Sequence, residues 1–217
     1  MAGSTVRAEQ VSATRGLILA TAERLFAERG VYAVSNRQIS EAAGQGNNTA
    51  VGYHFGSKAD VVRAIVRRHG EQVEAIRARL LDELGAGAGI REWVACLVRP
   101  IPEHLAALGS PTWYARFCTQ VMTDPALREI MVEESLESEA LQRTVEGLSR
   151  CLPQLPPEVR AERGAMARQL ILHTCAEHER ALAEGTAPFR SSWYGAATGM
   201  IDAVVGLWLA PATRDAG

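Results

Sequence analysis

The sequence lacks the features of a membrane or secreted protein. No apolar run reaches the length of about 18 residues that a membrane-spanning helix needs, and the first residues hold no basic segment followed by an apolar one. The four cysteines are scattered without a CxxC pair, which is typical of reduced, buried thiols and not of a disulfide framework. We therefore expect a cytoplasmic protein with no membrane partner.

Motifs of common enzyme classes are absent as well. The chain has no glycine-rich phosphate loop, no GxSxG and no HExxH, so we expect neither enzymatic activity nor a cofactor. The one group that resembles a metal site is His173 and Glu177, four residues apart on an expected helix. Such pairs are common by chance, so a metal-responsive function is kept only as the less favoured alternative. A redox-responsive function based on the cysteines is treated in the same way.

Lysine is almost missing, since Lys58 is the single one and the other basic side chains are arginines. The charges are divided unevenly along the chain. Residues 1–69 hold nine Lys and Arg against five Asp and Glu, a net charge of +4, whereas residues 70–217 hold fourteen against twenty, a net charge of −6. A basic segment on an acidic remainder suits a protein that meets phosphate through that segment alone.

Apolar residues recur at helical spacing, and no stretch shows the alternation typical of strands, so we expect an all-α fold. Residues 1–11 are expected to lack regular structure. Pro100 and Pro102 should kink or interrupt the helix that contains them. The nine expected helices lie at about 12–29, from Ser35 to the turn at Gly44, at 47–53, 57–84, 90–108, from Pro111 to Met122, and at 125–151, 157–184 and 191–209.

The stretch Gln38–Lys58 is expected to form two short helices joined by a tight turn. Gly44 and Gly46 flank that turn, where glycine adopts a positive φ at little cost. The second helix, at about 47–53, is roughly 10 Å long and rich in Asn and Thr. A helix of this length fits the major groove of DNA, and Asn can read adenine there. The pattern indicates a helix-turn-helix.

An ordered set of residues in this region carries a resemblance: Phe26, Gly30, Ile39, Ala43-Gly44, Tyr53-His54-Phe55 and Lys58. It resembles the N-terminal signature of the TetR family of transcriptional repressors over about residues 12–70. The resemblance is specific because many residues match in order. The chain is one residue longer than the common pattern between Ala43-Gly44 and His54-Phe55, and its Gly-Gln-x-Asn-Asn-x-Ala-Val run is similar to a subgroup of the family.

The resemblance implies a ligand-responsive repressor that binds a palindromic double-stranded DNA operator as a homodimer. It also implies a three-helix DNA-binding domain at 1–56 and a larger helical effector-binding and dimerisation domain at 57–217. Ser35 and Gln38 have the spacing of a capping box, so Ser35 can cap a helix whose N-terminus also holds a phosphate. Expected phosphate contacts are Arg15, Ser35, Arg37, Tyr53, His54 and Lys58, and expected base contacts are Gln45, Asn47, Asn48 and Thr49.

Large apolar rings with a few polar groups on three expected helices suggest a cavity for a small, largely apolar effector. The same residues would serve equally well as ordinary core, and both interpretations stay open. His69, on the inner stripe of helix 57–84, is expected to be a buried histidine and not a ligand. The candidate effector contacts are Trp93, Leu97, His104, Trp113, Phe117, Met122 and His173.

The expected helix at 191–209 has one large apolar face and a second face of small residues. A helix that is apolar or small nearly all round must be covered on both sides, and small residues let another helix approach closely. In the resembled family the last two long helices pair with their symmetry mates. The candidate dimer contacts are Trp193, Gly199, Ala203 and Gly206.

Overall fold

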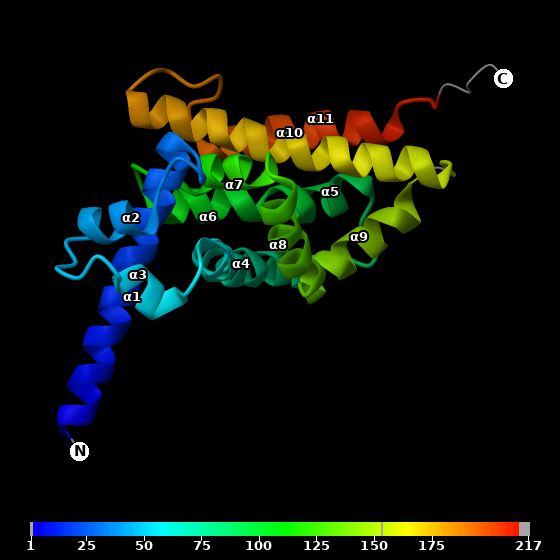
Figure 1. Ribbon diagram of the computed structural model, residues 1–217. Helices are drawn as coiled ribbons and strands as arrows, with labels where there is room; N and C mark the ends of the chain where they lie inside the picture. Colours follow the sequence, from blue (N-terminus) through cyan, green and yellow to red (C-terminus); the bar gives the residue numbers. More distant parts are fainter. Residues whose placement is uncertain (1, 153, 213–217) are drawn as a thin grey trace.

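The computed structural model describes residues 2–152 and 154–212, which form helices and no strand (Figure 1). The prediction of an all-α fold is confirmed. None of the described helices is long and apolar enough to cross a membrane. The helices are α1 (Ala2–Arg29), α2 (Asn36–Ala42), α3 (Ala50–Phe55), α4 (Lys58–Asp82), α5 (Ile90–Val98), α6 (Pro100–Leu108), α7 (Tyr114–Met122), α8 (Pro125–Leu136), α9 (Glu139–Cys151), α10 (Pro157–Glu184) and α11 (Trp193–Leu209).

Three of the expected helix boundaries were wrong. α1 begins at Ala2, so the segment expected to lack regular structure is helical. α3 begins at Ala50, three residues later than expected. The predicted interruption of the helix 90–108 is confirmed: it is divided at Arg99, because Pro100 starts α6 and has no N–H to continue α5. The expected helix 125–151 is divided as well, since Ser138 caps the start of α9.

Local capping explains where the helices of the N-terminal part begin. The side chain of Ser35 accepts from the N–H of Gln38 while the Gln38 side chain accepts from the N–H of Ser35, which is the predicted capping box. Ser57 and Asp60 form the same reciprocal pair at the start of α4. These two boxes fix the ends of the segment that contains α2 and α3.

Helices α1, α2 and α3 gather at one end of the molecule, and α4 runs from there into the remaining helices (Figure 1). α10 and α11 lie side by side along one edge and pack on α7, α5 and α6. Most of the buried apolar residues form one large cluster that extends from Ile18 of α1 to Trp208 of α11. Within it Phe26 of α1 stacks on Phe117 of α7, with ring centroids 6.3 Å apart. A division of the chain near residue 56 therefore remains a prediction, and a continuous core joins its two parts.

Candidate DNA-binding surface and ligand cavity

The turn between α2 and α3 is held by backbone and side-chain hydrogen bonds. Gly44 has φ of +65°, and Gly46 is not among the glycines with positive φ, so only one of the two glycines needs this freedom. Ser40 is fully buried; its hydroxyl donates to the carbonyl of Asn36 and accepts from the N–H of Val51 at 3.4 Å. Ser40 was not identified from the sequence. A serine between the buried Ile39 and the glycines of a tight turn could have indicated a side chain that bonds across the turn.

The residues expected to read bases lie at the N-terminal end of α3 and in the turn before it. Asn47 accepts hydrogen bonds through Oδ1 from both the N–H and the hydroxyl of Thr49, at 3.0 and 2.7 Å, so its side chain shapes the turn. Gln45 is half-buried and donates to the carbonyl of Ala43. Asn48 is exposed, and among the described residues its side chain has no hydrogen bond. Of the four candidates, Asn48 is thus the exposed one whose side chain has no partner among the described residues.

The expected phosphate contacts form two groups. Tyr53 is 82% exposed and Arg37 is exposed, with its Nε 2.7 Å from the Glu41 carboxylate. By contrast, Arg15 donates to the carbonyl of His54 and lies over the Phe55 ring at 4.3 Å. Tyr53 and Arg37 can turn toward a phosphate, whereas Arg15 already joins α1 to the end of α3.

Lys58 belongs to the second group. Its ammonium donates to the carbonyl of Val31 at 3.0 Å and lies 5.6 Å from the centre of the Tyr32 ring. Partial burial lowers the pKa of Lys58. The one lysine of the chain therefore connects the loop after α1 to the start of α4, a contact that the sequence did not reveal.

A chain of buried polar side chains links the DNA-binding end to the remaining helices. His69 of α4 bonds through Nε2 to Glu23 of α1 at 2.8 Å and through Nδ1 to Nε2 of His104 of α6 at 2.7 Å. The Tyr114 ring of α7 stacks on His69, with centroids 3.9 Å apart. Burial and the neighbouring His69 lower the pKa of His104 from 6.5 to about 4. The expectation that His69 is a buried histidine is confirmed.

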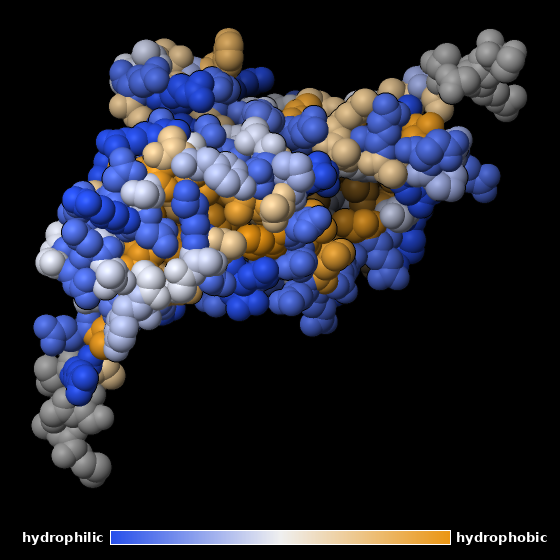
Figure 2. All heavy atoms as spheres, in the orientation of Figure 1, coloured by the Kyte–Doolittle hydropathy of each residue, from blue (hydrophilic) through white to orange (hydrophobic). Residues whose placement is uncertain are grey.

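A cavity of about 1,070 Å³ opens on the face shown in Figure 2, where apolar side chains gather over α8, α9 and α10. Its volume lies just above the range of about 300–1,000 Å³ that small-molecule sites in proteins occupy. Of the candidate effector contacts, Leu97 and Met122 line it. Most of the surface of its wall is apolar, although arginines and glutamates also line it. The apolar residues that surround Leu97 and Met122 include Val66, Val73, Ile101, Tyr114, Met131, Leu141, Leu148, Leu152, Ile171, Leu172 and Trp208.

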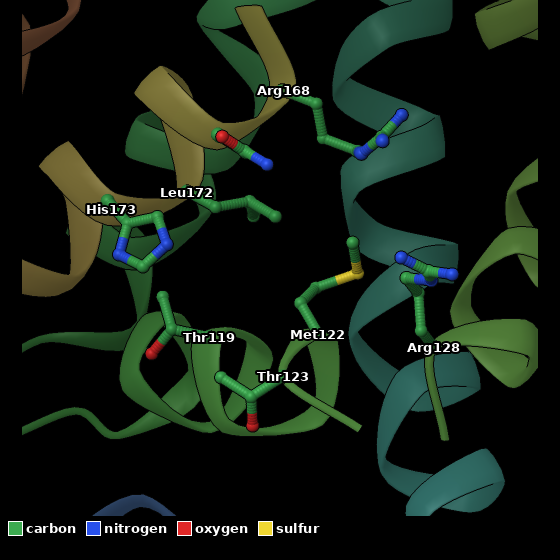
Figure 3. A pocket seen from close by; sticks show the side chains of 8 residues that line it. Thr119, Met122, Thr123, Arg128, Arg168, Leu172 and His173 are labelled. Carbon is green, nitrogen blue, oxygen red and sulfur yellow. The ribbon is translucent and has the colours of Figure 1, made fainter. Parts of the chain in front are cut away.

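A smaller pocket of about 220 Å³ adjoins the cavity and shares Met122, Arg168 and Leu172 with it. Figure 3 shows His173 of α10 on one side of this pocket and the arginines Arg128 and Arg168 on the other, with the Met122 side chain between them. His173 is therefore separated from the main cavity by Met122 and Leu172.

The remaining candidate effector contacts lie outside both walls. Phe117 of α7 is fully buried and stacks on Phe26 of α1, and the Nε2 of His104 is bonded to His69. Trp93 packs its ring directly against the Cα of Gly147, where an added Cβ would lie 2.3 Å from ring atoms. Trp113 is the partly buried residue before α7. Aromatic content thus marked core positions, because the apolar side chains of the cavity wall are mostly aliphatic.

Two family comparisons match the two parts of this geometry. Residues 18–65, with α2 and α3, match the family described as "Bacterial regulatory proteins, tetR family". Residues 95–206, more than half of the chain, match "Tetracyclin repressor-like, C-terminal domain". The chain belongs to the TetR family. It is a transcription regulator with a helix-turn-helix DNA-binding domain and a ligand-binding C-terminal domain.

Solved structures are similar to this TetR family chain along most of its length. The TetR family transcriptional regulator PfmR from Thermus thermophilus shares the fold, with a TM-score of 0.51 and 16% sequence identity over 91% of this chain and 96% of that one. The multidrug binding protein EbrR, complexed with imidazole, has a TM-score of 0.49 and 20% identity, over 92% of each chain. No curated protein matches the chain in sequence.

In this TetR family chain, α11 has an outward face of small residues. Ala203 and Gly206 are exposed, and a Cβ added to Gly206 would meet no atom within 4 Å. Gly199 is partly covered, since the Arg190 guanidinium lies 3.8 Å from where its Cβ would be. Trp193 is also partly buried and packs on His178 of α10, with ring centroids 4.3 Å apart. Of the candidate dimer contacts, Ala203 and Gly206 are thus the open ones.

Metal and thiol chemistry has little support in this TetR family chain. No group of three or more His, Cys, Asp or Glu residues is placed to hold a metal ion in the part of the chain that the structure describes. Glu177 is exposed and bonds to Arg180. Burial raises the pKa of the Cys96, Cys118 and Cys175 thiols, which disfavours the reactive thiolate.

Proposed function

We propose that this TetR family regulator is a ligand-responsive repressor that binds a palindromic operator as a homodimer and is released by a small, largely apolar effector. The observation that carries the proposal is the position of α4. Its first turns pack Val61 and Val62 into the core of the DNA-binding helices, and further along Val66 and Val73 line the large cavity. A ligand in the cavity thus touches the helix that supports the DNA-binding end.

In the proposed complex, each subunit places the start of α3 in a major groove. Asn48 makes the base contact, while Asn47 and Thr49 hold the turn in shape and Gln45 supports it. Tyr53, Arg37 and the N-terminus of α2 at Ser35 contact phosphate, and Arg15, His54 and Lys58 position these groups. This assigns a base-reading role to the Gly-Gln-x-Asn-Asn run. Two half-sites on one face of the duplex lie about 34–36 Å apart, or somewhat more.

Release of the operator requires that the effector bind more tightly to a conformation of the protein that does not bind DNA. A change from 99:1 to 1:99 in favour of the released state needs about 5.5 kcal/mol of differential binding. Tyr114 is placed to transmit part of it, because it lines the cavity and stacks on His69, which bonds to Glu23 of α1. Repacking at Tyr114 would shift α4 against α1 and change the separation of the two reading helices.

Selection from random-sequence DNA with the purified protein tests the DNA-binding part. We expect an inverted repeat, bound with an affinity that falls steeply with salt, since each phosphate contact adds roughly −0.9 to the slope of log K on log salt. Recovery of no enriched sequence, or of a single unrepeated site, would contradict the proposal. Loss of the selected DNA on titration with an effector, followed by tryptophan fluorescence, then tests the response.

A metal- or redox-responsive regulator on the same scaffold is the less favoured alternative. The burial of Cys96, Cys118 and Cys175 argues against a thiol switch. Operator affinity measured with and without added Zn²⁺ or peroxide separates the two signals from an organic effector.

A further inference from the structure

The wall of the large cavity holds one buried arginine with a side-chain donor that has no partner among the described residues. Arg77 of α4 is only 6% exposed, and its Nε has no hydrogen-bond partner among the described residues. Its ion pair with the Glu74 carboxylate is long, with 3.5 Å between Nη1 and Oε2, so the contact is weak. A buried guanidinium with an unmet donor is costly unless something else pairs with it.

Glu74 does not fully compensate this charge, because its carboxylate has other partners. It accepts from the Ser138 hydroxyl and, at 2.7 Å, from the N–H of Ala140, at the N-terminus of α9. Burial is the largest influence on Arg77 and lowers the pKa of its guanidinium, which is the direction expected of an under-compensated cation.

The other arginine that α4 contributes to the cavity wall is paired differently. The Nε of Arg67 donates to Glu134 at 2.8 Å, and Glu134 also accepts from Arg63. Arg67 is exposed, and its charge is met by a neighbouring carboxylate. Arg67 is thus exposed and paired with a carboxylate, whereas Arg77 is buried and keeps a donor that a ligand could use.

A second buried donor in the same wall also has no partner among the described residues, the Nε1 of Trp208. Both buried, unpartnered side-chain polar atoms of the described cavity wall are thus donors. A ligand that satisfies them must bring hydrogen-bond acceptors. Since most of the surface of the wall is apolar, the rest of the ligand must be apolar.

We infer that the effector of the large cavity is an amphipathic carboxylate, with an aliphatic body against the wall and its carboxylate paired with the buried guanidinium of Arg77. The inference rests on the proposed function and names the class of effector. The Nε–Nη edge of a guanidinium presents two donors that match the two oxygens of a carboxylate. A dianionic phosphate fits less well, because Glu71 and Glu74 also line the cavity and repel a second negative charge.

Calorimetric titration with three probes that share one alkyl chain tests the class: dodecanoate, dodecan-1-ol and dodecyl phosphate. We expect wild-type protein to bind dodecanoate about tenfold or more tightly than the alcohol, the value of one charge-assisted hydrogen bond. We expect it to bind the phosphate more weakly than the carboxylate. Equal affinity for carboxylate and alcohol, a preference for the phosphate, or no binding of any probe would overturn the inference.

Variants locate the carboxylate. Arg77→Met keeps the length of the side chain but removes its donors, so affinity for dodecanoate should fall to that for dodecan-1-ol, while the alcohol still binds. Arg67→Met is the matched control from the same helix and wall, and it should keep the preference. Arg168→Met, at an exposed residue of the wall, should keep it as well. Loss of the preference in either control, but not in Arg77→Met, would place the head group elsewhere and overturn the inference.

Arg77→Lys is a second variant that keeps the test informative if Arg77→Met does not fold. It keeps the charge but lacks the Nε donor, so the preference for dodecanoate should shrink without vanishing, and an unchanged preference would count against the inference. Operator release is scored separately on the selected DNA. Tight dodecanoate binding that depends on Arg77 but leaves operator affinity unchanged would support the ligand class and contradict the switch.

Discussion

At the scale of single residues, the buried group Glu23, His69 and His104 has the clearest physical consequences. These side chains come from α1, α4 and α6 and are each less than a tenth exposed. A buried polar network of this kind is stable only while every member keeps its partner. His104 can accept from or donate to His69 while neutral, and the Tyr114 ring closes the group on one side.

The network predicts a dependence of stability on pH. The pKa of His104 is about 4 in the folded protein against 6.5 unfolded, because burial and His69 disfavour its charged form. Above pH 6.5 both states are neutral at His104. Between pH 6.5 and 4 the unfolded state takes up the proton and the folded state does not, so the free energy of unfolding should decrease as the pH is lowered. This residue should account for a decrease of about 2 kcal/mol from pH 7 to pH 5.

Urea unfolding of wild type and of His104→Asn at pH 7 and pH 5 measures this. The wild type should lose about 2 kcal/mol more than the variant over that interval, although the variant starts less stable at pH 7 because it gives up the bond to His69. His173→Asn, on the exposed side of α10, is the control and should follow the wild type. The same loss in wild type and His104→Asn would show that His104 does not resist protonation in the fold.

Some residue-level features could be predicted from the sequence and others could not. The capping box of Ser35 and Gln38 depends on a spacing of three residues, and it formed as predicted. The partners of Arg15 and Lys58 could not be predicted, because they are backbone carbonyls 39 and 27 residues away in the chain. Arg77 was missed for the same reason. Its charge is only partly compensated because the Glu74 carboxylate accepts from the N–H of Ala140 in α9, and this contact between distant segments is not visible in the sequence.

At the scale of secondary-structure elements, the start of α3 decides how the reading helix meets DNA. Because α3 begins at Ala50, Asn47 and Asn48 precede the helix and adopt different roles despite being neighbours. Asn47 Oδ1 is occupied by Thr49, whereas Asn48 is exposed. The sequence placed both on the helix, since nothing in the pattern distinguishes a capping turn from a first helical turn here.

Matched alanine variants separate the two roles. Asn47→Ala should lower the free energy of unfolding by about 1 kcal/mol, the usual value of a lost intramolecular hydrogen bond, because its Oδ1 accepts from the N–H and the hydroxyl of Thr49, and it should weaken binding to all DNA sequences. Asn48→Ala should leave stability within about 0.5 kcal/mol of wild type, as for an exposed site, and relax base preference at one position of each half-site. Thermal unfolding and binding to a panel of singly substituted operators give both readouts, and an Asn48→Ala protein with unaltered base preference would refute the assignment.

The division of the expected helix 125–151 shows what local sequence cannot supply. No proline or glycine lies between Leu136 and Glu139, so periodicity continued through the break. In the structure Glu74 of α4 accepts from the N–H of Ala140 and from Ser138, which stabilises a new helix N-terminus at this point. A tertiary contact therefore ends one helix and starts the next, and it also forms one rim of the cavity.

At the scale of the whole molecule, the exposed small residues of α11 bear on assembly. The apolar face of α11, with Met200, Ile201 and Val204, is buried within the chain, as the sequence indicated. On the opposite face, Ala203 and Gly206 are exposed. The proposed homodimer would cover this face with the same helices of a second copy. Gly199 is less suited to test it, because Arg190 already lies over that position.

Ala203→Arg is therefore the sharper test of the homodimer. The side chain has open space in a single chain, so the variant should fold with nearly unchanged thermal stability, but a partner helix at 8–10 Å cannot accommodate it. Multi-angle light scattering should report a dimer for wild type and a monomer for Ala203→Arg. Operator affinity should fall about 100-fold or more, since two linked half-site contacts become one.

The matched control is Ala126→Arg, which adds the same charge at an exposed alanine on α8 and should stay dimeric. A wild type that is monomeric at micromolar concentration, or an Ala203→Arg protein that remains dimeric and binds operator normally, would exclude this face as the interface.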